Sequence, residues 1–198
     1  MSVHKKIKAA TRIHHDQTEQ LLAHSAFSSE FTVHDYRLFL LTNALFHRSL
    51  EQGLSAYLND TLVETLQWPK RRKTPLLLED LRTLGIAEEA TASSPMEINQ
   101  LPQALGVLYV AEGATLGGVM IRKALAQNAA LRAQSFAFLE CYGTQTGYYW
   151  KSFVDVLEQY LRTPDEEVVA IEAAQHTFQA YARYHQRAVQ YLENDFVG

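Results

Sequence analysis

The fold is decided by a long apolar run that reads QALGVLYVAEGATLGGVMIRKALAQN from Gln103 to Asn128. Its periodicity predicts a single helix. At 100° per residue, Gly106, Gly113 and Gly117 fall within roughly 40° of one another on that helix, and Gly118 follows directly. Each interior glycine costs about 1 kcal/mol relative to alanine. The helix therefore gives up stability to keep one stripe bare, which indicates close approach by another molecule or segment.

The bare stripe has two explanations, and both stay open at this point. Small residues allow a second helix to pack closely, which is the ordinary explanation in a helical bundle. The alternative is a flat, bulky ligand such as a planar macrocycle lying across the stripe, with a bend at Gly117-Gly118. A phosphate-binding loop is disfavoured, because no strand precedes the run and the glycines do not follow the Gly-x-Gly-x-x-Gly spacing.

The rest of the chain is also helical in its periodicity, without sustained strand alternation. Thr32 and Thr163-Pro164 are helix-start signals, whereas Gly85 and Pro69 are helix-stop signals. The predicted helices span 2–24, 33–58, 61–68, 74–85, 103–128, 144–160 and 164–194. We expect an all-α bundle that forms a single domain over residues 1–198.

The composition is that of an ordinary soluble globule, with 47% hydrophobic and 20% charged residues. A net charge of −4 predicts no nucleic-acid partner. The one basic run, Lys70–Lys73, is interpreted as a solvated loop. A single cysteine, Cys141, fits a reducing compartment and an unreactive buried thiol. The absence of a signal-like or 18-residue apolar stretch predicts a cytoplasmic protein with no membrane partner.

If the ligand on the stripe is a haem, another segment must supply an iron ligand, most often histidine. The first predicted helix contains His14 and His15. On a helical projection His14 lies in the middle of an apolar face made by Ile7, Ala10, Ile13 and Leu21. His15 lies about 100° away, in a stripe with Lys8, Thr11, Glu19 and Leu22. Glu19 could orient the His15 imidazole, although a plain surface histidine fits the same spacing.

Other metal chemistry has less support in the sequence. The Glu-x-x-His signature of di-iron bundles is absent, as are His-Glu-x-x-His and any pair of cysteines for zinc. Phe178 and Tyr181 have the spacing of core aromatics on one helix.

Taken together, the two helices resemble those of the haem oxygenase family. Residues 8–19 (KAATRIHHDQTE) are similar to the family's Lys-x-Ala-Thr-x-x-x-His-x-x-x-Glu, and residues 113–118 (GATLGG) are similar to its distal Gly-x-x-x-Gly-Gly. Residues 31–51, 148–153 and 163–178 resemble further family segments in the same order. The likeness covers most of the chain.

This resemblance implies a haem oxygenase-like bundle in which His15, rather than His14, ligates the haem iron. It implies that the remaining haem contacts come from Lys8, Thr11, Glu19, Gly113, Gly117, Gly118, Lys151 and Phe178. Lys8 and Lys151 would meet the propionates, and the bare glycines would let the distal helix lie over the ring. Several family members carry an aspartate after the first distal glycine, where it orders water near bound oxygen. This chain has Ala114 there, with Thr115 as the alternative residue to hold a water.

The resemblance further implies that haem is both substrate and cofactor. O2 and an electron-donating reductase or ferredoxin would convert it to biliverdin, carbon monoxide and iron. Two alternatives stay open. One is a haem-binding carrier or sensor without turnover, which Ala114 favours, and the other is a non-haem member of the same fold, such as a thiamin-degrading enzyme.

Overall fold

The computed structural model describes residues 1–195 apart from Ser29 and Ala56, with the side chains of 21–26 and 195 left out. Within this part of the chain every regular element is a helix, so the predicted all-α fold is confirmed. The α-helices are α1 (Val3–Ala26), α2 (Val33–Ser55), α3 (Asp60–Thr65), α4 (Trp68–Arg71), α5 (Thr74–Thr83), α6 (Leu101–Gln127), α7 (Thr146–Tyr160) and α8 (Pro164–Asp195). Short 3-10 turns cover Glu88–Thr91, Ala129–Leu131 and Gly143–Gln145.

Local signals set three of the helix ends where the sequence predicts them. The Thr32 hydroxyl accepts the Asp35 amide at 3.2 Å, and the Asp35 carboxylate accepts the Thr32 amide at 2.8 Å. Thr163 and Glu166 repeat this reciprocal arrangement before α8. Gly85 follows α5 with φ +73, a conformation that favours glycine. These four backbone amides and one turn therefore confirm the predicted starts of α2 and α8 and the end of α5.

Pro69 does not end the third helix as predicted. The helix stops earlier, at Thr65, and Gln67 takes a left-handed conformation with φ 51. Pro69 then lies in the first turn of α4. Proline is well suited to that place, because the first amides of a helix have no partner within it.

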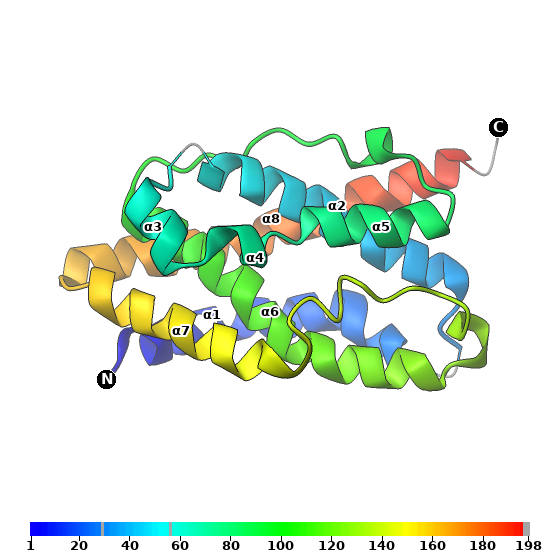
Figure 1. Ribbon diagram of the computed structural model, residues 1–198, viewed down its shortest axis with the longest axis horizontal. Helices are drawn as coiled ribbons and strands as arrows, with labels where there is room; N and C mark the ends of the chain where they lie inside the picture. Colours follow the sequence, from blue (N-terminus) through cyan, green and yellow to red (C-terminus); the bar gives the residue numbers. More distant parts are fainter. Residues whose placement is uncertain (29, 56, 196–198) are drawn as a thin grey trace.

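The long helices α6 and α8 form the centre of the bundle, and α8 also packs against α1 and α2. In Figure 1, α2 and α5 lie along one side of the molecule and α6 and α7 along the other, while α1 contacts α6, α7 and α8. The ribbon of α6 changes direction along its length although Leu101–Gln127 stays helical throughout. The buried side chains form two clusters, one around α6, α7 and α8 and one around α2 and α5.

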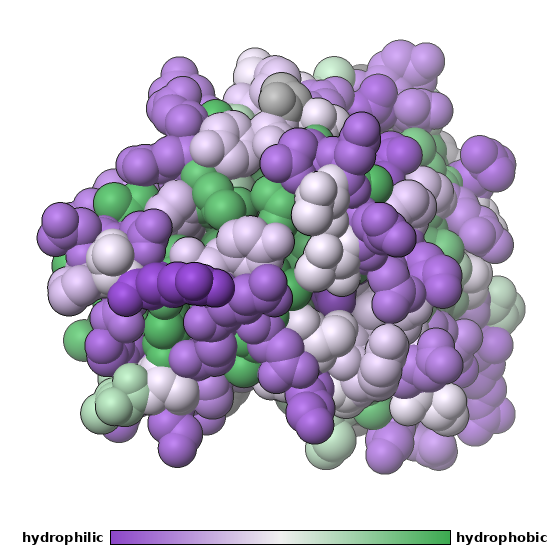
Figure 2. Space-filling model, turned by 60° about the vertical axis from the view of Figure 1, so that its left-hand side comes forward, coloured by the Kyte–Doolittle hydropathy of each residue, from purple (hydrophilic) through white to green (hydrophobic). Residues whose placement is uncertain are grey.

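α6 is long and apolar enough to cross a membrane by length and composition, but 56% of its most apolar window is buried inside the protein. The core helix of a soluble protein has the same properties, so this test assigns no membrane span. On the face shown in Figure 2 hydrophilic side chains predominate, and hydrophobic ones emerge in small patches between them.

The apolar face predicted for α1 is only partly right. Val3, Ile7 and Thr11 are buried in one narrow strip, whereas Ile13 is 70% exposed. Val3, Ile7 and Thr11 are spaced by four residues and therefore lie on one side of α1, a helix that packs against α8. Ile13 points about 120° away from Ile7 around the helix axis. The predicted members Leu21 and Leu22 lie outside the described side chains.

Candidate functional site

The glycine stripe of α6 serves two different purposes along its length. A Cβ on Gly106 would overlap the carbonyl oxygen of Ala170 and lie 2.9 Å from the Cβ of Ala173, both on α8. Gly106 therefore allows close helix packing, as the first explanation predicts. A Cβ on Gly117 would meet nothing within 4 Å. Packing between helices does not account for the glycine at this second position.

The side of α6 around Gly117 presents an apolar surface that is uncovered except at its start, where Gly113 is half-buried beside Trp150. We call it the open face of α6 and define it by Gly113, Leu116, Gly117 and Met120. Their spacing of i, i+3, i+4 and i+7 places them on one side of the helix. Leu116 and Met120 are 42% and 57% exposed although both are large and apolar. The structure therefore leaves a flat, apolar strip where the sequence predicts a ligand.

The neighbours of the open face include the other residues predicted for the distal segment. Gly118 is buried, and a Cβ there would lie 3.6 Å from Leu139. Ala114 is exposed. The Thr115 hydroxyl donates to the Glu112 carbonyl at 2.6 Å, so it retains only acceptor capacity for another group. Thr115 could still accept a hydrogen bond from a water.

α1 is held against α8 at several points along its length. The Gln175 amide donates to the Ala10 carbonyl at 3.1 Å, and Lys6 forms an ion pair with Glu167 at 2.5 Å. These contacts fix which side of α1 faces the bundle and which side stays in solvent.

His15 lies at the solvent edge of that contact. Its side chain is 56% exposed, and its ring meets the edge of Phe178 on α8 at a centroid distance of 6.1 Å. Its Nε2 lies 3.7 Å from a Glu19 carboxylate oxygen and its Nδ1 lies 3.8 Å from one of Asp16. These distances exceed a hydrogen bond. Both ring nitrogens are therefore available to a ligand, with two carboxylates beside them.

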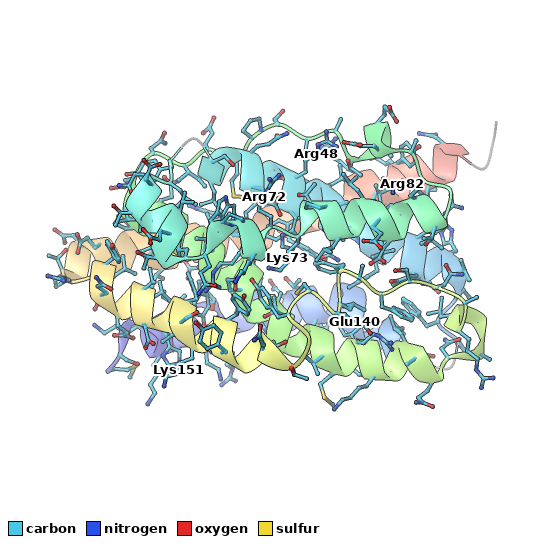
Figure 3. The ribbon with its side chains drawn as sticks, viewed as in Figure 1. Arg48, Arg72, Lys73, Arg82, Glu140 and Lys151 are labelled. Carbon is cyan, nitrogen blue, oxygen red and sulfur yellow. The ribbon has the colours of Figure 1, made fainter. Side chains whose placement is uncertain are left out.

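The predicted basic contacts are also free. Lys8 and Lys151 are exposed, and within the described residues neither has a hydrogen-bonding or ion-pair partner. Figure 3 shows Lys151 at the outer edge of α7. Thr11 differs, because it is buried and its hydroxyl donates to the Ile7 carbonyl at 2.8 Å within α1. Thr11 therefore faces the interior of the protein and is not presented to a ligand in this structure.

Trp150 on α7 contacts both α1 and α6. Its ring lies 6.5 Å from the ring of His4 on α1. On the α6 side, a Cβ placed on Gly113 would lie 3.7 Å from the Trp150 ring, which is ordinary van der Waals contact. Trp150 therefore lies between the first turns of α1 and the start of the open face.

The interpretation of Lys70–Lys73 as a solvated loop is wrong for two of its members. Arg71 and Lys73 are only 3% and 1% exposed. The Arg71 guanidinium lies 2.5 Å from the buried Glu112 carboxylate, and the Lys73 ammonium lies 3.4 Å from it. Figure 3 shows Lys73 in the middle of the molecule. Burial of these cations follows from their pairing, since an unpaired buried charge is very costly.

Tyr142 completes this arrangement, and we call Arg71, Lys73, Glu112 and Tyr142 the Glu112 cluster. The Tyr142 hydroxyl lies 2.9 Å from both Glu112 oxygens and 2.6 Å from the Lys73 ammonium. Burial, and then the Glu112 charge, raise the pKa of Tyr142, which therefore stays a protonated donor. A signal for this cluster was available, because Glu112 is the one charged residue between Leu101 and Ile121.

A hollow of about 400 Å³ lies on another part of the surface, beside α4, α5 and the start of α7. It is lined by Pro69, Lys70, Arg72, Pro75, Leu76, Cys141, Tyr142, Gln145 and Tyr149. None of the predicted ligand-contacting residues is among them. Cys141 is half-buried rather than buried as predicted, and burial is the largest cause of the raised pKa of its thiol.

Taken together, the open face of α6 and the predicted residues of α1 and α7 have the chemistry that a flat macrocycle with acid groups would need. Bare backbone and exposed apolar side chains on α6 suit a planar ring, an exposed imidazole on α1 suits a metal ion, and unpaired ammonium groups suit carboxylates. A phosphate or a free metal ion would gain no favourable contact from the apolar side chains of the open face.

Comparisons with known proteins point in the same direction. The family model described as Heme oxygenase matches residues 1–187. A protein named heme oxygenase from Xanthomonas campestris pv. campestris (strain 8004) is 34% identical over 134 residues, which make up 67% of this chain and 79% of the relative.

Solved structures share the fold at low sequence identity. The heme oxygenase of Leptospira interrogans has a TM-score of 0.75 at 17% identity, covering 93% of this chain and 98% of that one. The NO- and CO-bound heme oxygenase of Neisseria meningitidis has a TM-score of 0.70 at 22% identity, covering 95% and 92%. Heme oxygenase-1 of the cyanobacterium Synechocystis, solved in complex with heme, has a TM-score of 0.72 at 12% identity, covering 100% and 98%.

Proposed function

This chain belongs to the haem oxygenase family, and we propose that it cleaves haem oxidatively to biliverdin, carbon monoxide and iron. Membership makes it a haem-degrading enzyme for which haem is both substrate and cofactor. The observation that carries the proposal is the open face of α6, where Gly117 has nothing within 4 Å and Leu116 and Met120 are exposed. An apolar strip without a protein cover is a suitable wall for a porphyrin.

We assign iron ligation to His15 on α1. Its imidazole is 56% exposed and neither ring nitrogen is hydrogen bonded. Glu19 lies one turn away, where its carboxylate can accept the proton of the ring nitrogen that does not bind iron and so fix the tautomer. Phe178 supports the ring from the side.

The role of the open face is to keep large side chains away from the substrate. Glycine at 113 and 117 leaves only backbone above the substrate plane, so that little space separates the helix from the reacting edge of the ring. A larger side chain at either position would fill that space. The backbone of this segment therefore limits the directions from which a small reactant can reach the ring carbons.

Lys8 and Lys151 are assigned to the two substrate carboxylates. Both ammonium groups are exposed, so each pair contributes more to orientation than to affinity. Their placement decides which edge of the macrocycle lies under the glycines, and hence which ring carbon is attacked.

Bound haem supplies the iron that activates O2 and the ring that is oxidised. The electrons must come from outside, since no redox cofactor other than haem is part of the proposal, and a reductase or ferredoxin is the proposed donor. Solvent is proposed to supply protons at the open face, because Ala114 has no polar group and Thr115 lies about 160° from Gly117 around α6.

The test is a haem titration of the purified protein followed by reductant and O2. We expect a Soret band typical of histidine ligation, which then decays as a bilin band rises and carbon monoxide is released. A stable Soret band without bilin would support the second candidate, a haem-binding carrier or sensor, which Ala114 favours. Absence of a Soret band would instead support a non-haem member of the fold and overturn the proposal.

A further inference from the structure

We infer that the Glu112 cluster is a positioning device that holds the Gly113–Gly118 segment of α6 in its helical shape beside the substrate. The effect of the cluster on the reaction rests on the proposed function. Its support of the helix can be tested in the haem-free protein. The cluster directly precedes the open face in the sequence, because Glu112 is followed by Gly113.

The segment packs against Trp150 at Gly113 and against Leu139 at Gly118, but it has little support on the side of Gly117. It contains Gly113, Gly117 and Gly118, and each glycine weakens a helix relative to alanine. Gly117 has no neighbour within 4 Å at the position of a Cβ, so packing does not hold this side either. A helix with these properties opens locally unless something fixes one of its ends.

The Glu112 cluster supplies that fixed point from three separate parts of the chain. Arg71 comes from α4 and Lys73 from the loop before α5, while Tyr142 comes from the connector that follows α6. All three donate to the Glu112 carboxylate, at 2.5 Å, 3.4 Å and 2.9 Å. A side chain held from three directions in the interior has little freedom to rotate or shift, and its own backbone is held with it.

The same cations are tied to other elements, which makes the anchor rigid. The Arg71 guanidinium also donates to the Tyr149 carbonyl at 3.2 Å and to the Ser152 hydroxyl at 2.9 Å, both on α7. The Tyr142 and Tyr149 rings stack at a centroid distance of 4.2 Å. Displacement of Glu112 would therefore disturb α4, α7 and the connector together.

The charges in the cluster do not balance. Arg71 and Lys73 bring two positive charges and Glu112 brings one negative charge, and all three side chains are buried. A second buried carboxylate, Glu51, accepts the backbone amides of Lys73 and Thr74, while Glu112 is the carboxylate that the Arg71 guanidinium and the Lys73 ammonium contact. The position of Glu112 is therefore strongly determined. A structural core without a functional constraint could replace this group with apolar side chains.

The deciding experiment uses Tyr142→Phe, which removes one hydroxyl and keeps the stacked ring, so that the chain still folds. Tyr184→Phe is the matched control, because its hydroxyl donates to Ser49 at 2.6 Å and does not contact the cluster. Amide hydrogen exchange is measured in the haem-free proteins. We expect the Gly113–Gly118 amides to exchange roughly tenfold faster in Tyr142→Phe and unchanged in Tyr184→Phe. Equal protection in both variants, or faster exchange spread evenly over the whole chain, would overturn the inference.

A second measurement connects the cluster to the reaction. The Fe–C–O vibrational frequencies of the CO complex and the ratio of bilin isomers are recorded for the same two variants. We expect both to change in Tyr142→Phe while haem affinity stays within about twofold. If exchange changes but the CO complex does not, the cluster supports the helix without acting on the site, and the inference fails in its functional part. Failure of all proteins to bind haem would instead contradict the proposed function.

Discussion

Gly106 and Gly117 lie on the same stripe of α6, but only Gly106 is covered by another helix. A Cβ at Gly106 would overlap the Ala170 carbonyl of α8, whereas a Cβ at Gly117 would meet nothing within 4 Å. Helix packing therefore explains the glycine at 106 but not the glycine at 117, which is left to the proposed ligand. Between them, a Cβ at Gly113 would lie 3.7 Å from the Trp150 ring of α7.

This difference predicts opposite effects of the same substitution. Gly106→Ala should lower the free energy of unfolding by about 1–3 kcal/mol, because α6 and α8 must move apart. Gly117→Ala should raise it by up to about 1 kcal/mol, because alanine is the better helix former in open space. Urea denaturation of the haem-free proteins measures both. Equal effects of the two substitutions would contradict the division of the stripe.

The assignment of the iron ligand makes a second prediction. His15→Ala should lose the Soret band of histidine ligation on haem addition, and added imidazole should restore it by occupying the vacated position. His14→Ala is the control, since His14 lies about 100° away on α1 and is more buried. Loss of the band in His14→Ala but not in His15→Ala would move the ligand to His14.

The buried charges make a third prediction, about stability. Arg71→Met should cost about 3–5 kcal/mol, since it removes the guanidinium that pairs with buried Glu112 and also donates to the Tyr149 carbonyl and the Ser152 hydroxyl. Lys6→Met removes an ion pair whose lysine is 38% exposed and should cost about 0–1 kcal/mol. Chemical denaturation compares the two variants. A small effect of Arg71→Met would mean that the interior of the cluster is accessible to water.

His47 makes a fourth prediction, about pH. Its side chain is buried between Phe46 and Phe138, and burial, followed by the Lys73 charge, holds its pKa well below the ordinary 6.5. The unfolded chain therefore binds a proton below about pH 6.5 that the folded chain does not bind. Folding stability is complete above that pH and falls by up to about 1.4 kcal/mol per unit as the pH drops towards the folded pKa.

The measurement is the free energy of unfolding of the unaltered protein and of His47→Leu between pH 5 and pH 8. The difference between them should be constant above pH 6.5 and shift in favour of His47→Leu below it. His185, whose pKa burial also lowers, contributes equally to both proteins and cancels. A difference that does not vary with pH would show that His47 has the same pKa in the folded and the unfolded chain.

Local signals in the sequence were sufficient for the fold. Thr32, Gly85 and Thr163 act through hydrogen bonds or backbone angles within a few residues, so the helix ends they set are predictable without tertiary information. The bare stripe of α6 and the exposed His15 were also visible as patterns on single helices.

Features that depend on distant partners could not be predicted in the same way. Arg71 and Lys73 resemble a solvated basic run because their partner, Glu112, lies about 40 residues further along the chain. Ile13 resembles a core residue because its exposure depends on which side of α1 meets α8. A lone acid inside an apolar helix was the one local indication that buried cations were needed.

The open face of α6 has a consequence for the protein when it holds no substrate. Exposed apolar strips favour self-association, and Leu116 and Met120 form such a strip. Under the proposed function the substrate itself covers the strip, and each completed turnover uncovers it again. Haem supply would then govern solubility and resistance to unfolding as well as flux, since a ligand that binds only the folded chain stabilises it by mass action.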